Sequence, residues 1–498
     1  MKLPKLPKPS RLPRSVRLHK LKTWQYTAGA ATVGLALAVG TVTAAGPWDS
    51  GQRTAERDLA ASRDRDGGAD HGRAGAPADA EPAPAPSAPG VLAALGAPAG
   101  SAPAPTGQAL ADVLDPLLRD PSLGARRTAS VVDVATGKQV YAAGAGDAVT
   151  PASTTKIATA AAALKALGPD HRLVTKAVAE PDSKEVALVG AGDPTLTARK
   201  DANGDASLRA LAADTAKALK ERGTEDGIRL TYDTSLYSGP DLHPIGRDEN
   251  LAPVSALMAD EARLDDSRHG TAWRSTDPAG DAARKFADLL RDQGVKIEGE
   301  PGPTKAGDHA DTLAKTESAP LSALVERMLT HSDNDIAEAL ARQAALASGE
   351  PASFDGAERA VAAQLKKLQL PLSGTRFADG SGLNRADRLT AELLTALLAR
   401  AADPAHPELR PILTGLPIAG FTGTLQNRYP SSSPGTGLVR AKTGTLTGVN
   451  TLAGTVVDAD GRLLAFAFTA MDTTNRYTAQ ATLDRMASTL ANCGCRET

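Results

Sequence analysis

The sequence predicts a mixed α/β (α+β) fold, because hairpin patterns lie at both ends of a long stretch that also holds helical patterns. Residues 128–142 read as a β-hairpin around a Thr-Gly-Lys turn. Residues 450–470 read as a second hairpin, whose turn is Asp460-Gly461. Residues 154–167 are Ala-rich and free of Gly and Pro, which favours a helix.

The other elements follow from helix caps and from the spacing of apolar residues. Ser207 can cap a helix on which Leu208 and Leu211 share one face, and Gly223 ends it. The pair Asp277-Pro278 begins a further helix. The remaining expectations are helices at 110–118 and 478–491 and strands at 128–134, 140–142, 228–232, 438–442, 450–457 and 463–470.

Length and charge narrow the class of protein. At 498 residues the chain is long enough for several domains, since one domain usually needs about 150 residues. Its formal net charge of −2 argues against a nucleic-acid partner, which would require a basic face. Aromatic residues make up only 3%, so the core must be built from Ala and branched aliphatic side chains.

The N-terminus predicts export across a membrane. Eight Lys or Arg residues and no acid occur within residues 1–22, and a charge-free stretch of 20 residues follows at 26–45. Twenty residues at 1.5 Å each match a hydrocarbon core of about 30 Å, and the basic flank should stay in the cytoplasm. We expect a basic cytoplasmic segment at 1–25 and a transmembrane anchor or a cleaved signal at 26–46, which leaves both outcomes open.

A spacer should separate this segment from the folded body. Residues 74–107 hold eight prolines among Ala, Ser and Gly, a composition that buries too little apolar surface to fold. We therefore expect a disordered linker at 47–108 that spans on the order of 100 Å. At the other end, Cys493 and Cys495 are too few for a zinc site, and a disulfide across one residue would be strained. Either no catalytic role or a structural or redox disulfide fits them.

The first motif with chemical meaning is Ser153-Thr154-Thr155-Lys156. Three residues make nearly one helical turn, so Ser153 and Lys156 share a face. A hydroxyl needs a base in contact to become a good nucleophile, and a lysine serves only when its amine is neutral. Burial and a second nearby cation both lower the pKa of a lysine. Alone, the motif is more typical of an ordinary helix start with Ser153 as its N-cap.

Two further motifs follow in the order Ser332-Asp333-Asn334 and Lys442-Thr443-Gly444. The first can relay a proton and hold a substrate carbonyl, although Ser and Asn also favour ordinary helix caps. The second lies at the end of a predicted strand, where Lys442 supplies the second cation and Gly444 would let a substrate backbone approach closely. Ser-x-x-Lys, Ser-Asp-Asn and Lys-Thr-Gly together form the signature of penicillin-binding proteins and related β-lactamases.

On these motifs the sequence resembles the low-molecular-mass penicillin-binding proteins of the D-alanyl-D-alanine carboxypeptidase/endopeptidase type over roughly residues 109–490. The resemblance implies a β-lactamase/transpeptidase-like catalytic domain at 109–168 and 320–498, with an antiparallel sheet flanked by helices, and an inserted accessory domain at 169–319. Further segments that look like this family are residues 190–196, 379–383 and 423–428, for which ordinary turn chemistry is the alternative.

The resemblance also implies the residues' roles. Ser153 would be acylated, Lys156 would be its general base, and Ser332 would pass a proton to the departing D-alanine. The backbone N–H groups of Ser153 and Thr445 would form the oxyanion hole. The substrate would be peptidoglycan stem peptides, with β-lactams as covalent inhibitors. The substrate-binding residues would be Asn334, Lys442, Thr443, Gly444 and Thr445.

Three alternatives were weighed against this function. A β-lactamase needs a carboxylate that acts as a base on water, and none can be assigned, since Glu338 is expected simply to face solvent on its helix. A catalytically silent penicillin-binding sensor or scaffold would keep the motifs without turnover. A triad hydrolase lacks support, because no Gly-x-Ser-x-Gly elbow occurs and His331 is expected at the surface. No His-Glu-x-x-His motif occurs either, so we predict neither a metal nor another cofactor.

Overall fold

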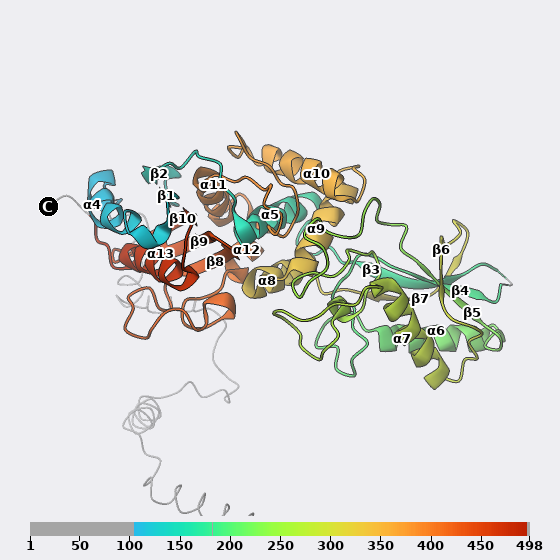
Figure 1. The fold of residues 1–498 in the computed structure, drawn as a ribbon. Helices are drawn as coiled ribbons and strands as arrows, with labels where there is room; N and C mark the ends of the chain where they lie inside the picture. The colour runs from blue at the N-terminus through green and yellow to red at the C-terminus, as the bar shows by residue number, and fades with distance from the viewer. Residues whose placement is uncertain (1–103, 182, 496–498) are drawn as a thin grey trace, which may run out of the picture. The chain divides into compact units, whose positions relative to one another are not determined.

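The structure is a computed structural model, and it describes residues 104–181 and 183–495 (Figure 1). The predicted anchor or signal segment at 26–46 lies outside the described residues. Within the described part of the chain, no helix is long and apolar enough to cross a bilayer.

The first of two sheets is antiparallel throughout and has the strand order β2-β1-β10-β9-β8. β1 (Arg126–Asp133) and β2 (Lys138–Ala143) form the predicted N-terminal hairpin, and β1 pairs along its length with β10 (Leu463–Met471). β9 (Val449–Val457) then joins β10 to the edge strand β8 (Arg440–Leu446). The mixed α/β fold with an antiparallel sheet is therefore confirmed.

Helices cover both faces of this sheet, and the alternation along β10 explains how (Figure 1). Phe466 and Phe468 pack on one face with the helices nearest the chain ends. Ala465 and Ala467 point to the other face, where small side chains admit a thicker helical layer. The first face is covered by α4 (Gly107–Leu118) and α13 (Arg476–Ala491), and the second by α5 (Thr155–Leu167), α8 (Leu321–His331), α9 (Asn334–Ala347), α10 (Phe354–Lys367), α11 (Ala391–Ala402) and α12 (Arg410–Gly415).

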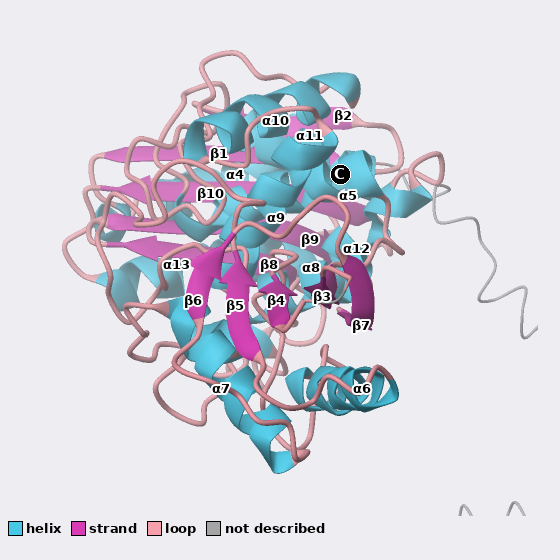
Figure 2. Ribbon diagram, turned by 90° about the vertical axis from the view of Figure 1, so that its right-hand side faces the viewer, coloured by secondary structure: helices cyan, strands magenta, loops and turns pink. Residues whose placement is uncertain are grey.

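Between α5 and α8 the chain builds a second five-stranded sheet, in the order β6-β5-β4-β3-β7 (Figure 2). The sequence indicated short strands here but not their pairing. β4 pairs in parallel with β5, and β5 with β6, because a helix crosses over between the members of each pair. The elements are β3 (Val174–Ala179), β4 (Glu185–Val189), α6 (Leu208–Glu221), β5 (Arg229–Asp233), α7 (Pro278–Asp292), β6 (Gly302–Thr304) and β7 (Asp311–Glu317).

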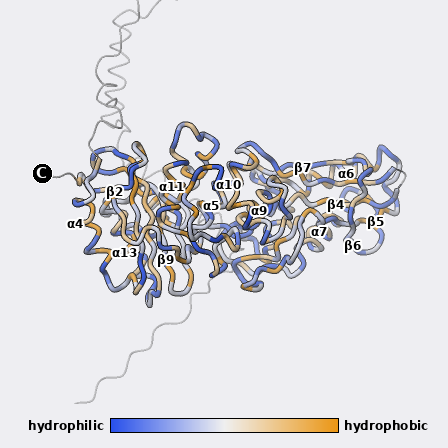
Figure 3. Tube along the Cα trace, turned by 90° about the horizontal axis from the view of Figure 1, so that it is seen from above, coloured by the Kyte–Doolittle hydropathy of each residue, from blue (hydrophilic) through white to orange (hydrophobic). Residues whose placement is uncertain are grey.

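Apolar side chains close this second unit as well. Phe286 and Leu290 on α7 are buried against Leu188 and Leu230 of the sheet. Hydrophobic and hydrophilic residues are interspersed along the chain (Figure 3). β9 and β10 are buried along nearly their whole length, as expected for strands with helices on both faces.

The first and last described residues meet beside α4. This helix begins at Gly107 and is capped by Thr106, so folded structure starts slightly before the expected boundary at 108. The backbone N–H of Thr106 donates to the carbonyl of Cys495 at 3.0 Å. Cys493 is bonded to Cys495 as a disulfide, which was one of the two alternatives left open by the sequence.

Replacing Phe466 should expose how far the fold depends on β10. The ring is fully buried and stacks on Phe468 with centroids 5.0 Å apart. We expect Phe466→Ala to lower the free energy of unfolding by about 3–5 kcal/mol, measured by urea denaturation. Val457→Ala, on a side chain that is 37% exposed, should cost less than about 1 kcal/mol. Equal losses in the two variants would contradict this account of the core.

Candidate active site

Ser153 lies on a one-turn 3₁₀ helix, Ala152–Thr154, that leads directly into α5. The carbonyl of Pro151 fixes this Ser153 turn, because it accepts hydrogen bonds from the hydroxyls of Thr154 at 2.7 Å and Thr451 at 2.9 Å. Ala152 has a φ of 49°, an unusual value for a residue with a side chain. The expected helix is present, but Thr154 rather than Ser153 is its N-cap residue.

Lys156 lies one turn further and its side chain is fully buried. Its Nζ donates to Ser153 Oγ at 3.0 Å, to Asn334 Oδ1 at 2.7 Å and to the carbonyl of Ser381 at 2.6 Å. Three acceptors match the three N–H groups of an ammonium ion. The position of the amine is therefore fixed from three sides.

Burial lowers the pKa of both lysines in the site. Burial lowers the pKa of Lys156 to about 8, although the charges of Asp379 and Glu338 act in the opposite direction. Burial, and then the nearby charge of Lys156, lower the pKa of Lys442 well below its usual range. An amine in such surroundings can become neutral near neutral pH, which is the state that a general base requires.

Lys442 reaches the site from β8 and meets the second motif. Its Nζ donates to Ser332 Oγ at 2.8 Å and to the carbonyl of Thr443 at 2.8 Å. Ser332 ends α8 in a left-handed conformation, with φ 60° and ψ 40°. Asp333 then caps α9 by accepting from the N–H of Ile336 at 3.0 Å. The motif thus spans the corner between two helices.

Gly444 allows β8 to approach the Ser153 turn. A Cβ at this position would lie 2.1 Å from Thr451 Oγ1 and 2.8 Å from the carbonyl oxygen of Pro151. The close approach is therefore made by the protein's own turn, whereas the sequence suggested a substrate backbone.

Five of the predicted residues line one pocket of about 350 Å³, namely Ser153, Ser332, Asn334, Thr443 and Thr445. Lys156 and Lys442 reach it through their hydrogen bonds to Ser153 and Ser332. Thr443 Oγ1 donates to Thr424 Oγ1 at 2.9 Å, and Gln480 Nε2 donates to Thr445 Oγ1 at 3.1 Å. Thr424 belongs to the segment 423–428, so that segment contributes to the pocket wall as well as to a turn. Leu383, from the segment 379–383, also lines the pocket. The lining residues that the sequence motifs did not include are Asn250, Arg263, Gly270, Thr271, Arg274 and Gln480.

Glu338 corrects one expectation. It is fully buried, and the prediction that it faces solvent is wrong because α9 is enclosed on nearly every side. Its Oε1 accepts the backbone N–H groups of Gly380 at 3.1 Å and Ser381 at 2.9 Å. Burial, and then the charge of Asp379, raise the pKa of Glu338. This carboxylate holds a loop and has no access to substrate.

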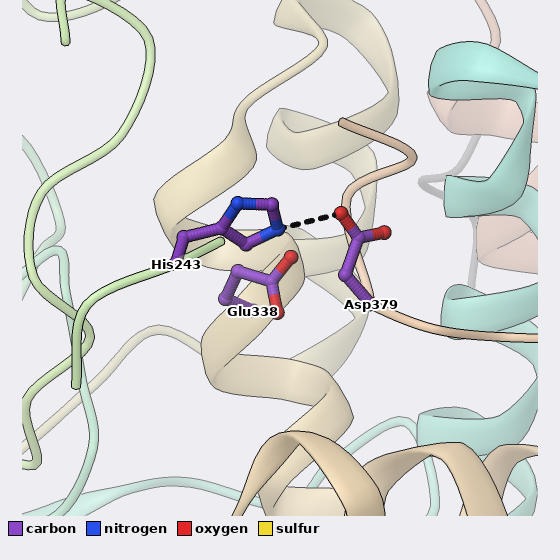
Figure 4. A group of neighbouring side chains, drawn as sticks. All are labelled: His243, Glu338 and Asp379. Atoms are coloured by element: carbon purple, nitrogen blue, oxygen red, sulfur yellow. Dashed lines mark hydrogen bonds and ion pairs between the residues drawn. The ribbon is translucent and has the colours of Figure 1, made fainter. Parts of the chain in front are cut away.

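His243, Glu338 and Asp379 form a buried cluster (Figure 4). His243 Nε2 lies 2.8 Å from Asp379 Oδ2, and Nδ1 accepts the N–H of Ile245 at 3.2 Å. These partners assign the proton to Nε2. The three residues are suitable types for a metal site, but each candidate ligand residue is already engaged by protein donors or acceptors. The cluster is therefore a hydrogen-bonded network.

His331 directly precedes the second motif. It is half-buried, lines the pocket, and stacks on His269 with ring centroids 4.4 Å apart. Burial, and then His269 and Arg327, lower the pKa of His331. The expected surface histidine is thus part of the pocket wall.

Comparison with solved structures defines the class of protein. The crystal structure of penicillin binding protein 4 (dacB) from Haemophilus influenzae matches with a TM-score of 0.63 at 23% identity, and the match covers 76% of this chain and 97% of that chain. The same protein complexed with a novel β-lactam matches with a TM-score of 0.58 at 24% identity, over the same shares of the two chains. The fold is that of a low-molecular-mass penicillin-binding protein.

Sequence comparison then gives the family. Carboxypeptidase DacB of Mycolicibacterium smegmatis is 38% identical over 427 residues, which cover 83% of this chain and 90% of that protein. A D-alanyl-D-alanine carboxypeptidase of Actinomadura sp. is 30% identical over 431 residues, which cover 71% of this chain and 79% of that protein. This chain belongs to the D-Ala-D-Ala carboxypeptidase 3 (S13) family, whose model matches residues 110–268 and 265–492. It is thus a serine-type carboxypeptidase, as the motifs predicted.

A methyl group at Gly444 should disturb the Ser153 turn. We expect Gly444→Ala to slow acylation by a fluorescent penicillin by about 100-fold, since small displacements of reacting groups cost that much. It should also lower the free energy of unfolding by about 1–3 kcal/mol. Gly302→Ala is the control, because a Cβ there meets nothing within 4 Å. Unchanged acylation in Gly444→Ala would show that the turn tolerates the contact.

Proposed function

We propose that the Ser153 hydroxyl attacks the terminal D-alanyl-D-alanine bond of peptidoglycan stem peptides and that β-lactams acylate the same oxygen. The observation that carries the proposal is the 3.0 Å contact between Lys156 Nζ and Ser153 Oγ. The burial of Lys156 supports it, because removal from water makes this amine easier to deprotonate. The charge of Lys156 adds to the same effect of burial on Lys442.

The partners of Lys156 select where its lone pair points. A neutral amine has two N–H groups and one lone pair. Asn334 Oδ1 and the carbonyl of Ser381 can only accept, so they retain the two N–H groups. The hydroxyl of Ser153 can donate, and the lone pair is left facing it. Deprotonated Lys156 is thereby aimed at the proton it has to remove.

Acylation then forms a bond from Ser153 Oγ to the carbonyl carbon and breaks the bond to the leaving nitrogen. The hydroxyl proton goes to Lys156, and Ser332 gives its proton to the leaving amine and recovers one from Lys442. The new charge on Lys156 favours proton release from Lys442. In deacylation a water proton returns through Ser332 to Lys442, and Lys156 returns its proton to Ser153.

The exposed edge of β8 supplies the other contacts. The N–H of Ala441 donates to the carbonyl of Pro417, away from the sheet. Alternate residues of a strand share this direction, so the N–H of Thr445 faces the same open edge. With the N–H of Ser153 it would form the oxyanion hole. The hydroxyls of Thr443 and Thr445 would receive the terminal carboxylate.

The same proposal assigns the N-terminal segment to export. The basic stretch at 1–22 and the charge-free stretch at 26–45 support delivery of the folded part to the outer side of the cytoplasmic membrane, with the segment retained as an anchor or cleaved. Stem peptides are found on that side.

A β-lactamase is the alternative reaction, and it would need a carboxylate placed to activate water. Glu338, which was considered for that task, has its oxygens committed to the N–H groups of Gly380 and Ser381. The lifetime of the penicillin adduct separates the two reactions, because a β-lactamase would release it rapidly.

The pH dependence of acylation tests the role of Lys156. Below a pKa of about 8 the amine carries a proton and cannot accept another. We expect the acylation rate constant to rise roughly tenfold per pH unit up to about pH 8 and then to level off. Stopped-flow measurements with a chromogenic β-lactam would record it. Lys156→Gln should lose both the rate and the rise, and a profile that falls with pH would exclude a lysine base.

Mass spectrometry of the intact protein with penicillin tests the role of Ser153. We expect a covalent adduct on the parent chain and none on Ser153→Ala, because the attacking oxygen is gone. Ser432→Ala, at an exposed serine, is the matched control and should acylate normally. Release of free D-alanine from a wall pentapeptide should follow the same order. An equal adduct on Ser153→Ala would refute the assignment.

A further inference from the structure

We propose that residues 243–250, which lie in the segment inserted between α5 and α8, orient the general base, and that His243 is a positioning residue for the reaction. The inference rests on the proposed function, because it concerns the direction of the Lys156 lone pair. It follows from tracing what holds each of the two acceptors that retain the N–H groups of Lys156.

The first acceptor is the carbonyl of Ser381, on the loop of residues 379–384. Asp379 folds this loop around its carboxylate, which accepts the N–H of Gly382 at 2.6 Å and of Asn384 at 2.7 Å. Glu338 binds the N–H of Ser381 from the other side at 2.9 Å. The carbonyl of Ser381 is therefore as fixed as these two carboxylates are.

His243 fixes Asp379 in turn. The imidazole comes from the inserted segment and donates from Nε2 to Asp379 Oδ2 at 2.8 Å, with side chains that are 1% and 0% exposed (Figure 4). Burial alone would raise the pKa of Asp379, but hydrogen bonds from His243 and Asp387 lower it to about 2. Burial and the charge of Asp379 raise the pKa of Asp387 to about 10, so Asp387 stays protonated as a donor.

The second acceptor is Asn334 Oδ1. Its amide orientation is set by the inserted segment, because Nδ2 donates to the carbonyl of Asn250 at 3.0 Å and leaves Oδ1 facing Lys156. The chain beside Asn250 is itself held, since the N–H of Ala252 donates to Asp335 on α9 at 3.0 Å. The buried Arg274 also pairs with Asp335 at 3.0 Å.

One stretch of eight residues thus holds both acceptors, Asn334 by a direct hydrogen bond and the Ser381 carbonyl through Asp379. If the Ser381 carbonyl shifts, one N–H of neutral Lys156 loses its partner and the amine can turn toward Ser153 with hydrogen instead of its lone pair. Substrate recognition by Thr443 and Thr445 on β8 involves none of these bonds. Loss of the His243 contact should therefore slow the chemical step and leave non-covalent binding intact.

Two substitutions at His243 separate this role from simple packing. His243→Gln keeps a donor near the position of Nε2 and loses the acceptor for Ile245. His243→Asn keeps an acceptor near Nδ1 and cannot reach Asp379. Each variant removes one of the two ring hydrogen bonds. The measurement is stopped-flow acylation of the full chain by a chromogenic β-lactam, resolved into the dissociation constant of the first complex and the acylation rate constant, beside the melting temperature.

We expect His243→Asn to lower the acylation rate constant by about 10- to 100-fold, with the dissociation constant changed less than about twofold. His243→Gln should recover most of the rate. The proposal would be overturned if both variants had the parent's acylation rate constant and differed from it only in a lower melting temperature. So would equal losses in the two variants. Failure of the parent to acylate at Ser153 would instead refute the proposed function itself.

Discussion

The site depends on the buried amine of Lys156, whose three hydrogen-bond partners are fixed by the fold. Lys156 Nζ is enclosed by Ser153, Asn334 and the Ser381 carbonyl, each from a different element. Desolvation makes the amine easy to deprotonate, but desolvation alone gives no direction. Direction comes from two oxygens that can only accept. A good base at this position therefore requires both a dry site and an exact arrangement of acceptors around it.

The need to fix the acceptors of Lys156 explains why several carboxyl groups are buried around the site. Glu338, Asp379 and Asp387 all lie within the helical layer, where ionised groups are expensive unless they are hydrogen-bonded. Here they are matched by backbone N–H groups, by His243, or by staying protonated. The pKa of Asp379 is lowered, whereas the pKa values of its neighbours Glu338 and Asp387 are raised. The result is a rigid support for the Ser381 carbonyl oxygen. Burying these charged groups costs free energy that an apolar core would not require.

The sequence predicted the parts of the site that reside in short motifs and missed those that depend on packing between distant segments. Ser153 and Lys156 are one turn apart, and helical spacing alone brings them together. By contrast, Glu338 looked like a solvent-facing residue, because nothing local reveals that α9 is enclosed on nearly all sides. His243 carried no signal, since its partner Asp379 is 136 positions away. The hairpins were predictable from their turns, whereas the parallel pairs of the second sheet depend on crossovers by α6 and α7.

The pairing of β1 with β10 determines when the protein can become active during its synthesis. Arg126 faces Met471 across the sheet, so the central pair of strands joins residues that are made at opposite ends of synthesis. Such a sheet cannot close before its last strands are made, and long-range pairing of this kind is slow. The site therefore stays incomplete until the last strands are made, because one of them, β8, carries Lys442.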